Sequence, residues 1–338
     1  MPLTLVDQGL LSTNAQYTGF KNRLINGDMV IDQRNNGATV TPADTAYTLD
    51  RWQSRNDGKF SVARSTVAPA GFTNSLLVTS LSSYSVGATD FYTQAQQIEG
   101  FNVADLGWGT ANAQTVTLSF WVRSSLTGTF GGALRNSGGN RSYVFSYSIP
   151  SANTWTNVSV TIPGDTTGTW LTDNGVGIRV EFGLGVGSSF SGTAGVWAAN
   201  ANRSVTGAVS VVGTNGATWQ MTGAQLEKGQ TATSFDVLPY GTELALCQRY
   251  FEVEVISGST AYAFNVDGAN KYLRTTSYSV TKRATPTAVI IGTPTYFCAS
   301  SLSIAPTTTT ATHRVTKTCA GSGEFEAGNY SVSYSSEL

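Results

Sequence analysis

The sequence predicts an all-β protein in which a jelly-roll β-sandwich is followed by a short helical joint and a smaller C-terminal β-domain. Glycine, serine and threonine are abundant while lysine and glutamate are scarce. This composition is typical of short strands joined by tight turns. Stretches in which apolar and polar residues alternate recur along the chain, as expected of half-buried strands. A helical stripe with three-to-four spacing is convincing only at residues 242–251.

The chain begins with a stretch that has no sustained periodicity. Residues 1–20 are interpreted as an N-terminal arm that serves for attachment, with a disordered tail as the alternative. The jelly-roll domain is predicted to span residues 21–237. Asn26-Gly27 predicts a turn, a short strand is expected at residues 29–31, and Trp52 is expected to anchor the core.

Alternating segments then follow at the spacing of a two-sheet sandwich. Strands are predicted at residues 60–64, 75–79, 91–98, 115–124, 142–149, 154–162, 175–184 and 218–226. Eight or so antiparallel strands of this length form a jelly roll or a related sandwich. A long polar insert at residues 188–216 interrupts the pattern, so its place on the sandwich stays open.

The second domain is predicted to span residues 238–338 and to open with the helix. Thr242 is the expected cap, and Leu244, Cys247 and Phe251 form the expected buried stripe. Short strands are predicted at residues 249–255, 261–266, 278–281, 288–291, 295–298, 313–318 and 329–333. A unit of this size can just support its own core and often relies on neighbours.

Composition also bears on partners and compartment. The formal net charge is −1 and charged residues are few, so neither nucleic acid nor an anionic membrane is an expected partner. No apolar run is long enough to insert into a membrane, and no signal peptide is visible. Cys247, Cys298 and Cys319 are odd in number and widely spaced, which favours reduced core thiols over disulfides or a zinc site.

Two further features could suggest chemistry, and both have simpler interpretations. His313 is the one histidine, and without a nucleophile signature it is interpreted as a strand-surface residue. The glycines at 183, 185 and 187 resemble a phosphate loop, but no Lys-Ser/Thr pair follows and no helix is expected there. A strand that ends in a glycine-rich turn accounts for them.

Glycan hydrolysis needs two facing acids, so pairs of carboxylates are the candidates for that chemistry. Glu324 and Glu326 are interpreted as a solvated strand edge, while Asp165 and Asp173 flank Trp170 in a loop. No catalytic residue is assigned, and the protein is predicted not to be an enzyme. Asp28 and Asp50 were considered as calcium ligands, but a turn explains Asp28 without metal. No cofactor and no metal site is predicted.

The candidate binding residues lie on two strands whose polar faces carry unexpected side chains. Residues 115–124 present Trp121 and Arg123 opposite an apolar face, and residues 175–184 present Arg179 and Glu181 in the same way. If the two strands are adjacent, these four side chains form one patch. An aromatic plate beside polar groups suits a sugar, because the ring packs on a pyranose while Arg and Glu bind its hydroxyls. A subunit interface and plain surface are the alternatives. Further candidates are Trp108 and Trp170, followed by Trp155 and Trp197.

Several spans resemble a family of bacteriophage tail-fibre and virion structural proteins. They are residues 21–28 (KNRLINGD), 47–52 (YTLDRW), 225–229 (QLEKG), 240–250 (YGTELALCQRY) and 334–338 (YSSEL). In addition, residues 119–124, 154–162 and 223–228 resemble central strands of carbohydrate-binding-module jelly rolls, although the insert at 188–216 departs from that pattern.

The resemblance implies a non-enzymatic virion structural protein, made in the host cytoplasm and located in the tail or another surface appendage. Its expected form is a tail fibre or adhesin that contacts host-surface glycans. The implied partners are a second and third copy in a homotrimer, other virion proteins held through the N-terminal arm, and a host glycan. A purely architectural head-decoration or head-fibre protein is the alternative, and a polysaccharide-degrading tailspike is the second.

Overall fold

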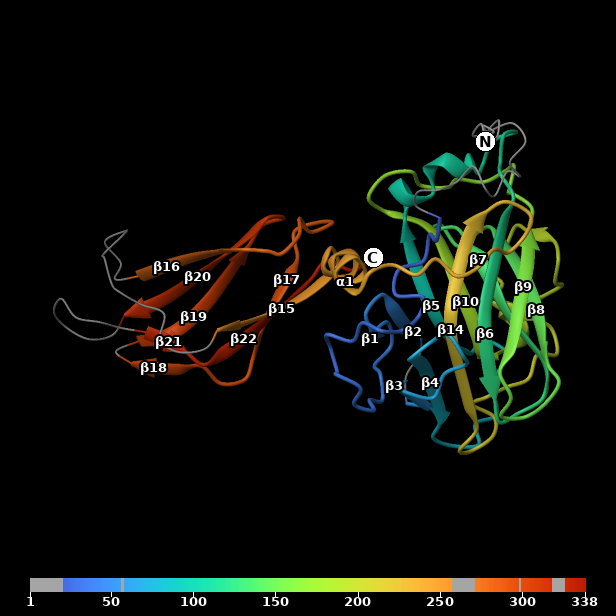
Figure 1. The fold of residues 1–338 in the computed structure, drawn as a ribbon, viewed down its shortest axis with the longest axis horizontal. Coiled ribbons are helices and arrows are strands. Elements are labelled where there is room, and N and C mark those ends of the chain that lie inside the picture. Colours follow the sequence, from blue (N-terminus) through green and yellow to red (C-terminus); the bar gives the residue numbers. More distant parts are fainter. Residues whose placement is uncertain (1–20, 56–57, 257–270, 298, 318–325) are drawn as a thin grey trace, which may run out of the picture. The chain divides into compact units, whose positions relative to one another are not determined.

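The computed structural model of the 338-residue chain describes residues 21–55, 58–256, 271–297, 299–317 and 326–338. Several predictions lie outside these residues, namely the arm at 1–20, the strand at 261–266, Cys298, Cys319 and Glu324. The chain divides into two compact units, Met1–Pro239 with Leu338 and Tyr240–Glu337. Each unit is described by itself (Figure 1).

The first unit is a sandwich of two antiparallel sheets. One sheet has seven strands in the order β1 (Tyr47–Leu49), β2 (Trp52–Arg55), β5 (Phe91–Glu99), β10 (Val176–Val186), β7 (Gly128–Arg135), β8 (Ser142–Ile149) and β12 (Trp197–Ala198). The other has five strands in the order β3 (Phe60–Ser65), β4 (Ser75–Ser80), β14 (Thr218–Lys228), β6 (Val116–Ser124) and β9 (Thr156–Ile162). Short pieces complete it, namely η3 (Gly100–Asn102), η4 (Ala104–Leu106), η5 (Ser188–Phe190), β11 (Ser191–Gly192) and β13 (Ser204–Val205). The predicted all-β jelly-roll class is confirmed.

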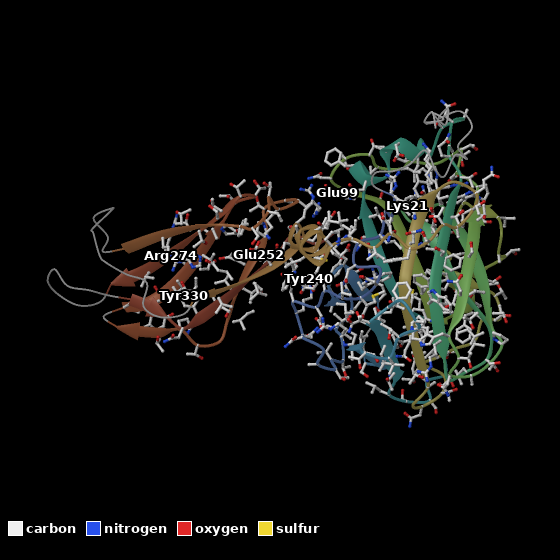
Figure 2. The ribbon with its side chains drawn as sticks, viewed as in Figure 1. Lys21, Glu99, Tyr240, Glu252, Arg274 and Tyr330 are labelled. Atoms are coloured by element: carbon white, nitrogen blue, oxygen red, sulfur yellow. The ribbon has the colours of Figure 1, made fainter. Side chains whose placement is uncertain are left out.

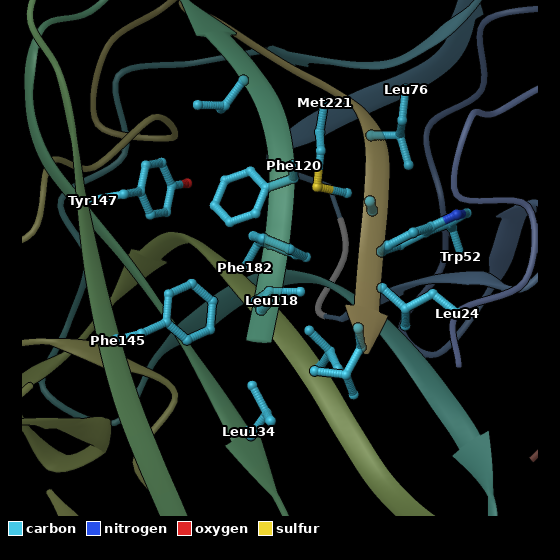
Figure 3. Close-up of a cluster of buried hydrophobic side chains, with 14 of the residues drawn as sticks. Leu24, Trp52, Leu76, Leu118, Phe120, Leu134, Phe145, Tyr147, Phe182 and Met221 are labelled. Carbon is cyan, nitrogen blue, oxygen red and sulfur yellow. The ribbon is translucent and has the colours of Figure 1, made fainter. Parts of the chain in front are cut away.

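The core lies between the two sheets and is dense in aromatic side chains (Figure 3). Phe120 projects from the five-stranded sheet and meets Phe182 of the seven-stranded sheet, with ring centroids 5.1 Å apart. Trp219 donates its indole N–H to the Tyr147 hydroxyl across the same interior at 3.1 Å. Trp52 is fully buried, as predicted for a core anchor. Alternation along each strand thus places one apolar face of each sheet against the other.

Residues 21–28 close one side of the sandwich by bonding to β14, which lies some 200 residues later in the chain. Arg23 donates its main-chain N–H to the carbonyl of Leu226, and Ala224 donates to the carbonyl of Gly27, both at 2.9 Å. The Asn22 side chain bonds the main chain of Ala224 and Leu226 at 3.0 Å. A Cβ atom at Gly27 would overlap the carbonyl of Ala224, so this approach requires glycine. Two of the spans that carry the family resemblance are therefore in contact.

A third such span, residues 47–52, joins the same junction. Trp52 donates its indole N–H to the carbonyl of Asn26, whose side-chain amide donates to the carbonyl of Asp50, both at 3.0 Å. The Asn26 side chain also bonds the main-chain N–H and carbonyl of Ile31. The strand predicted at residues 29–31 is therefore wrong, because Asn26 takes these main-chain groups and Met29 adopts a φ of +61°.

The eight strands predicted after residue 59 are all present, with ends shifted by at most two residues. In contrast, the sequence gives no sign of β7. Its residues GTFGGALR lack clear alternation because glycine stands where a side chain would not fit. A Cβ atom at Gly132 would overlap the ring of Phe145, and one at Gly131 would overlap Ser204.

The second unit begins with α1 (Tyr240–Gln248), and its described residues form three small sheets. They are ordered β15 (Phe251–Ile256), β22 (Tyr330–Ser335), β17 (Thr287–Ile291); β16 (Lys271–Ser277), β20 (Thr310–Lys317), β19 (Ala299–Pro306); and β18 (Thr295–Phe297), β21 (Glu326–Gly328). The strand predicted at residues 278–281 is wrong. Ser279 instead donates its main-chain N–H and hydroxyl to Glu252. Strands β16, β19 and β21 were not predicted.

Helix α1 is confirmed, but it begins at Tyr240, before the predicted cap at Thr242, and ends before Phe251. Its buried residues are Glu243 and Cys247. Of the predicted stripe, Cys247 and Phe251 are buried, whereas Leu244 is half-buried. Cys247 is a buried, reduced thiol, as predicted.

His313 is the clearest correction in the second unit, because it is buried and not on the strand surface. It lies on β20, the central strand of its sheet, and alternation puts it on the same buried face as Ala311 and Val315. Its Nδ1 lies 3.0 Å from the hydroxyl of Tyr330, which Figure 2 labels, and its Nε2 lies 3.2 Å from a Glu254 carboxylate oxygen. The histidine is therefore part of a buried polar network.

Candidate functional site

Trp121 and Arg123 lie on the outer face of β6, between β14 and the edge strand β9 of the five-stranded sheet, and both are half-buried. Trp121 stands opposite Asn157 of β9 and opposite Thr222 of β14. Asn157 is exposed while Thr222 is buried, so the indole lies at the border between covered and open sheet surface. Trp155 immediately precedes β9 and is also half-buried.

Arg123 is fixed beside this indole by two neighbours. Its Nε donates to the carbonyl of Asn153 at 2.8 Å, and one Nη donates to the side-chain oxygen of Gln220. Gln220 in turn lies within 3.3 Å of the Ser75 hydroxyl on the adjacent strand. The group Trp121, Arg123, Asn157 and Gln220 is called the tryptophan face below. The Arg123 guanidinium would lose little further conformational entropy on binding a ligand, because its two hydrogen bonds already fix its position.

Arg179 and Glu181 do not join Trp121 and Arg123 in one patch. They lie on β10, which belongs to the seven-stranded sheet and is not a neighbour of β6. Each sheet turns its apolar side chains toward the shared core, so the polar faces of the two strands point to opposite sides of the sandwich. The adjacency that the single patch required is absent.

Glu181 is instead the centre of a buried ion cluster on the outer side of the seven-stranded sheet. Its side chain is 1% exposed, and it accepts hydrogen bonds from Arg135 of β7 at 2.8 Å and from Arg203 at 2.7 and 2.9 Å. Burial raises the pKa of Glu181, but the two arginine charges outweigh burial and the pKa lies below its usual range. Burial lowers the pKa of Arg203 to about 10, against the opposing effect of Glu181.

The insert at residues 188–216 supplies Arg203 and covers part of this sheet. A Cβ atom at Gly183 of β10 would meet the Ser204 side chain, which shows how closely the insert approaches. The Arg203 guanidinium lies 3.8 Å from the ring centroid of Phe91, whose edge meets Phe190 at 5.2 Å. Sequence reasoning missed Arg135, because β7 was not recognised, and Arg203, because nothing in the insert signals which strand it covers.

Trp108 and Trp170, the other two candidates, do come together, and they also meet Trp197. The three indoles pack edge-to-face, with ring centroids 4.8, 5.4 and 5.5 Å apart. Trp108 and Trp170 are only 7% and 9% exposed, so most of their ring surface is already in contact with protein. This packing is that of a small aromatic core.

Asp165 lies under the tryptophan cluster and is bound as an ion. Arg141 donates to both of its carboxylate oxygens at 2.6 and 2.7 Å, and Trp170 donates to one at 3.3 Å. Burial raises the pKa of Asp165, yet the hydrogen bonds from Arg141 outweigh it and the pKa is lowered. Asp173 accepts the main-chain N–H of Gly175 at 2.8 Å. A glycosidase acid needs a raised pKa, so Asp165 is unsuited to that role.

Asp28 and Asp50 both have a pKa raised by burial. The two oxygens of Asp50 accept hydrogen bonds from the main-chain and side-chain N–H groups of Gln33, each at 2.7 Å. The Asp50 carboxylate therefore holds Gln33 in place. Across the ranges that the structure describes, no three His, Cys, Asp or Glu side chains gather in a way that could hold a metal ion. Over the same ranges, no helix has the length and apolar character needed to cross a bilayer.

No family model matches the chain, and no curated protein matches it. Among solved structures, the enzymatically active domain of tailspike protein 4 from bacteriophage CBA120 shares 12% identity and a TM-score of 0.31, over 62% of this chain and 21% of that one. An exo-beta-agarase shares 10% identity and a TM-score of 0.33, over 60% and 25%. The family 11 carbohydrate-binding module of a Clostridium thermocellum cellulase shares 15% identity and a TM-score of 0.28, over 58% and 98%. Identities and TM-scores of this size do not assign the chain to any of these families.

Proposed function

We propose that this chain is a non-enzymatic structural protein of a bacteriophage virion, a tail fibre or adhesin whose tryptophan face binds a host-surface glycan. The observation that carries the proposal is the half-buried indole of Trp121 on the outer face of a sheet, beside an arginine held in place by Gln220. Exposure of an indole to water is energetically unfavourable unless a partner covers the ring.

The chemistry of the tryptophan face suits a sugar ring. The flat indole of Trp121 offers apolar area to the C–H face of a pyranose, and Arg123 offers donors to its hydroxyls. The exposed amide of Asn157 supplies both a donor and an acceptor on the neighbouring strand. Aromatic area combined with a few placed polar groups is the pattern of small-ligand sites in general.

Glycan-array binding by the full chain tests the proposal. We expect Trp121→Ala to lower the signal for bound glycans at least tenfold and Trp121→Phe to restore part of it. The matched control is Phe101→Ala, which removes a 62%-exposed aromatic side chain from η3 and should leave binding unchanged. An unchanged glycan profile in Trp121→Ala would reject the tryptophan face.

Two further experiments on the same protein test the head-decoration and tailspike alternatives. Stoichiometric labelling of phage capsids without any glycan binding would favour the head-decoration alternative. Release of reducing sugar from host polysaccharide would establish a polysaccharide-degrading tailspike instead. Immunogold labelling of tails in intact particles is the outcome that supports the proposed location.

Self-association into a homotrimer is part of the proposal, and the second unit offers a surface for it. The outer face of its β15–β22–β17 sheet exposes Val255 at 70%, Val289 at 54% and Ile291 at 47%. Serines 331 and 333 of β22 stand between them. A hollow of about 270 Å³ at this face is lined in part by Val255 and Ile291. Exposed apolar area of this kind marks interaction surfaces.

The oligomer is tested by measuring the mass of the full chain at micromolar concentration. Three times the protomer mass of 35.6 kDa is expected. Val255→Lys with Ile291→Lys should dissociate the assembly, while Val237→Lys, at an equally exposed valine of the first unit, should not. A monomer of the unchanged protein would reject self-association and leave the glycan proposal standing.

A further inference from the structure

Arg179 stands out on the seven-stranded sheet because its side chain forms no ion pair with any carboxylate of the described residues. It is half-buried on the outer face of β10, between Arg135 of β7 and Gln97 of β5. Within the described residues its side chain makes no hydrogen bond and no ion pair, and its Nε is buried without a partner. Burial lowers the pKa of Arg179; Glu181 opposes this, and the charges of Arg135 and Arg55 reinforce it.

The charge of Glu181 acts on Arg179, but its carboxylate is hydrogen-bonded to two other arginines and not to Arg179. One of its oxygens accepts from Arg135 and Arg203, and the other accepts from Arg203. Arg135 and Arg203 therefore share one carboxylate while Arg179 lies beside Arg135, so these three arginines carry two more positive charges than Glu181 compensates. The other nearby arginine, Arg55, has its own carboxylate partner at 3.6 Å.

This arrangement is costly if it serves only the fold. Like charges directly opposite on neighbouring strands destabilise a sheet, and a half-buried cation without a partner loses hydration. Gln97 is 3% exposed, and its side-chain oxygen has no hydrogen-bond partner. Its amide nitrogen donates to Gln53 and to the Tyr47 hydroxyl at 3.1 Å, and to the main-chain oxygen of Leu338 at 2.7 Å. A neutral side chain at position 179 would remove the repulsion.

We propose that Arg179 binds the carboxylate of an acidic sugar, which makes the outer face of the seven-stranded sheet a second glycan-binding site, separate from the tryptophan face. The planar fork of a guanidinium matches a carboxylate and can bind it with two parallel hydrogen bonds. The ligand's negative charge compensates the excess positive charge around Glu181. A nucleic acid is disfavoured, because its backbone needs a row of cations and the chain carries a net charge of −1.

The proposal rests on the proposed glycan-binding function but uses different residues, and calorimetric titration of the full chain distinguishes the two. The probes are glucuronate and N-acetylneuraminate, with glucose as the neutral counterpart and sulfate as the inorganic anion. Binding of at least one acidic sugar, weakened by added salt, is expected, and glucose should not bind at Arg179. Arg179→Met should lower the acidic-sugar affinity at least tenfold, Arg179→Lys should lower it less, and Trp121→Ala should not change it.

A matched control is Arg314→Met, which removes one positive charge from an exposed position in the second unit. Without ligand, Arg179→Met should melt no lower than the unchanged protein, because it relieves the repulsion with Arg135; a lower melting temperature would assign Arg179 a structural role instead. Equal affinity for sulfate and sugar acids would reduce the site to one for anions in general and reject the sugar assignment. Loss of neutral-glycan binding only in Trp121→Ala, with no acidic-sugar binding, would reject this inference and leave the proposed function intact.

Discussion

Replacing Glu181 by glutamine tests the electrostatic account of the seven-stranded sheet. The variant keeps the shape of the side chain but removes the charge that two arginines share, and Arg135, whose side chain is 3% exposed, is left without a counter-ion. Breaking a buried ion pair by changing one partner costs about 3–5 kcal/mol. For a unit of this size about 1 kcal/mol shifts the melting temperature by roughly 2–4 °C, so a fall of about 6–20 °C is expected.

The assay is thermal unfolding followed by tryptophan fluorescence, which reports on the first unit because all seven tryptophans lie between residues 52 and 219. The control is Glu181→Leu combined with Arg135→Met and Arg203→Met, which replaces the whole cluster by apolar side chains. Such replacements are often neutral or stabilising, so the triple variant should recover most of the loss. A fall of less than about 3 °C for Glu181→Gln would refute the reasoning, as would a triple variant no more stable than the single one.

Three other outcomes follow from contacts described above. Gly27→Ala should lower the urea midpoint of the first unit, because its Cβ would overlap a carbonyl of β14; an unchanged midpoint would contradict the close approach. Lys282→Ala should cost the second unit about 3–5 kcal/mol in urea unfolding followed by circular dichroism, since its fully buried Nζ pairs with Glu252 at 2.6 Å. Burial raises the pKa of Glu254, but hydrogen bonds, first from His313, outweigh it and hold the pKa below the ordinary 4.5. The stability from this group should therefore be full above about pH 4.5 and lost as the pH falls through the lower folded value. Glu254→Gln should flatten that dependence, and an equally steep profile would speak against it.

The sequence was sufficient where alternation decides the structure. Alternation predicted the positions of β6 and β10 and the apolar face that each turns to the core, because a strand that packs on one face must alternate. Which strands are neighbours is a long-range property, and alternation carries no information about it. Hence Arg179 was grouped with Trp121, although the two belong to opposite sheets.

The remaining misses have particular causes. Strand β7 was not predicted because Phe145 and Ser204 pack so closely against it that glycine is required where strands usually carry β-branched or aromatic residues. His313 was placed at the surface because a polar residue in a short strand usually lies there, whereas its hydrogen bond with Tyr330 and its contact with Glu254 allow it to be buried.

The bonds between residues 21–28 and β14 also set the order in which the first unit can be completed during translation. The ribosome releases the Asn22 region about 200 residues before the strand that holds it. Until β14 emerges, Leu24 and Met29, which end in the core, have no final partner and remain open to non-native association. Bringing residues 21–28 onto β14 closes a loop of about 200 residues, and the entropy cost of that closure comes late in folding. The growing chain should therefore depend on chaperones until about residue 228 has been released.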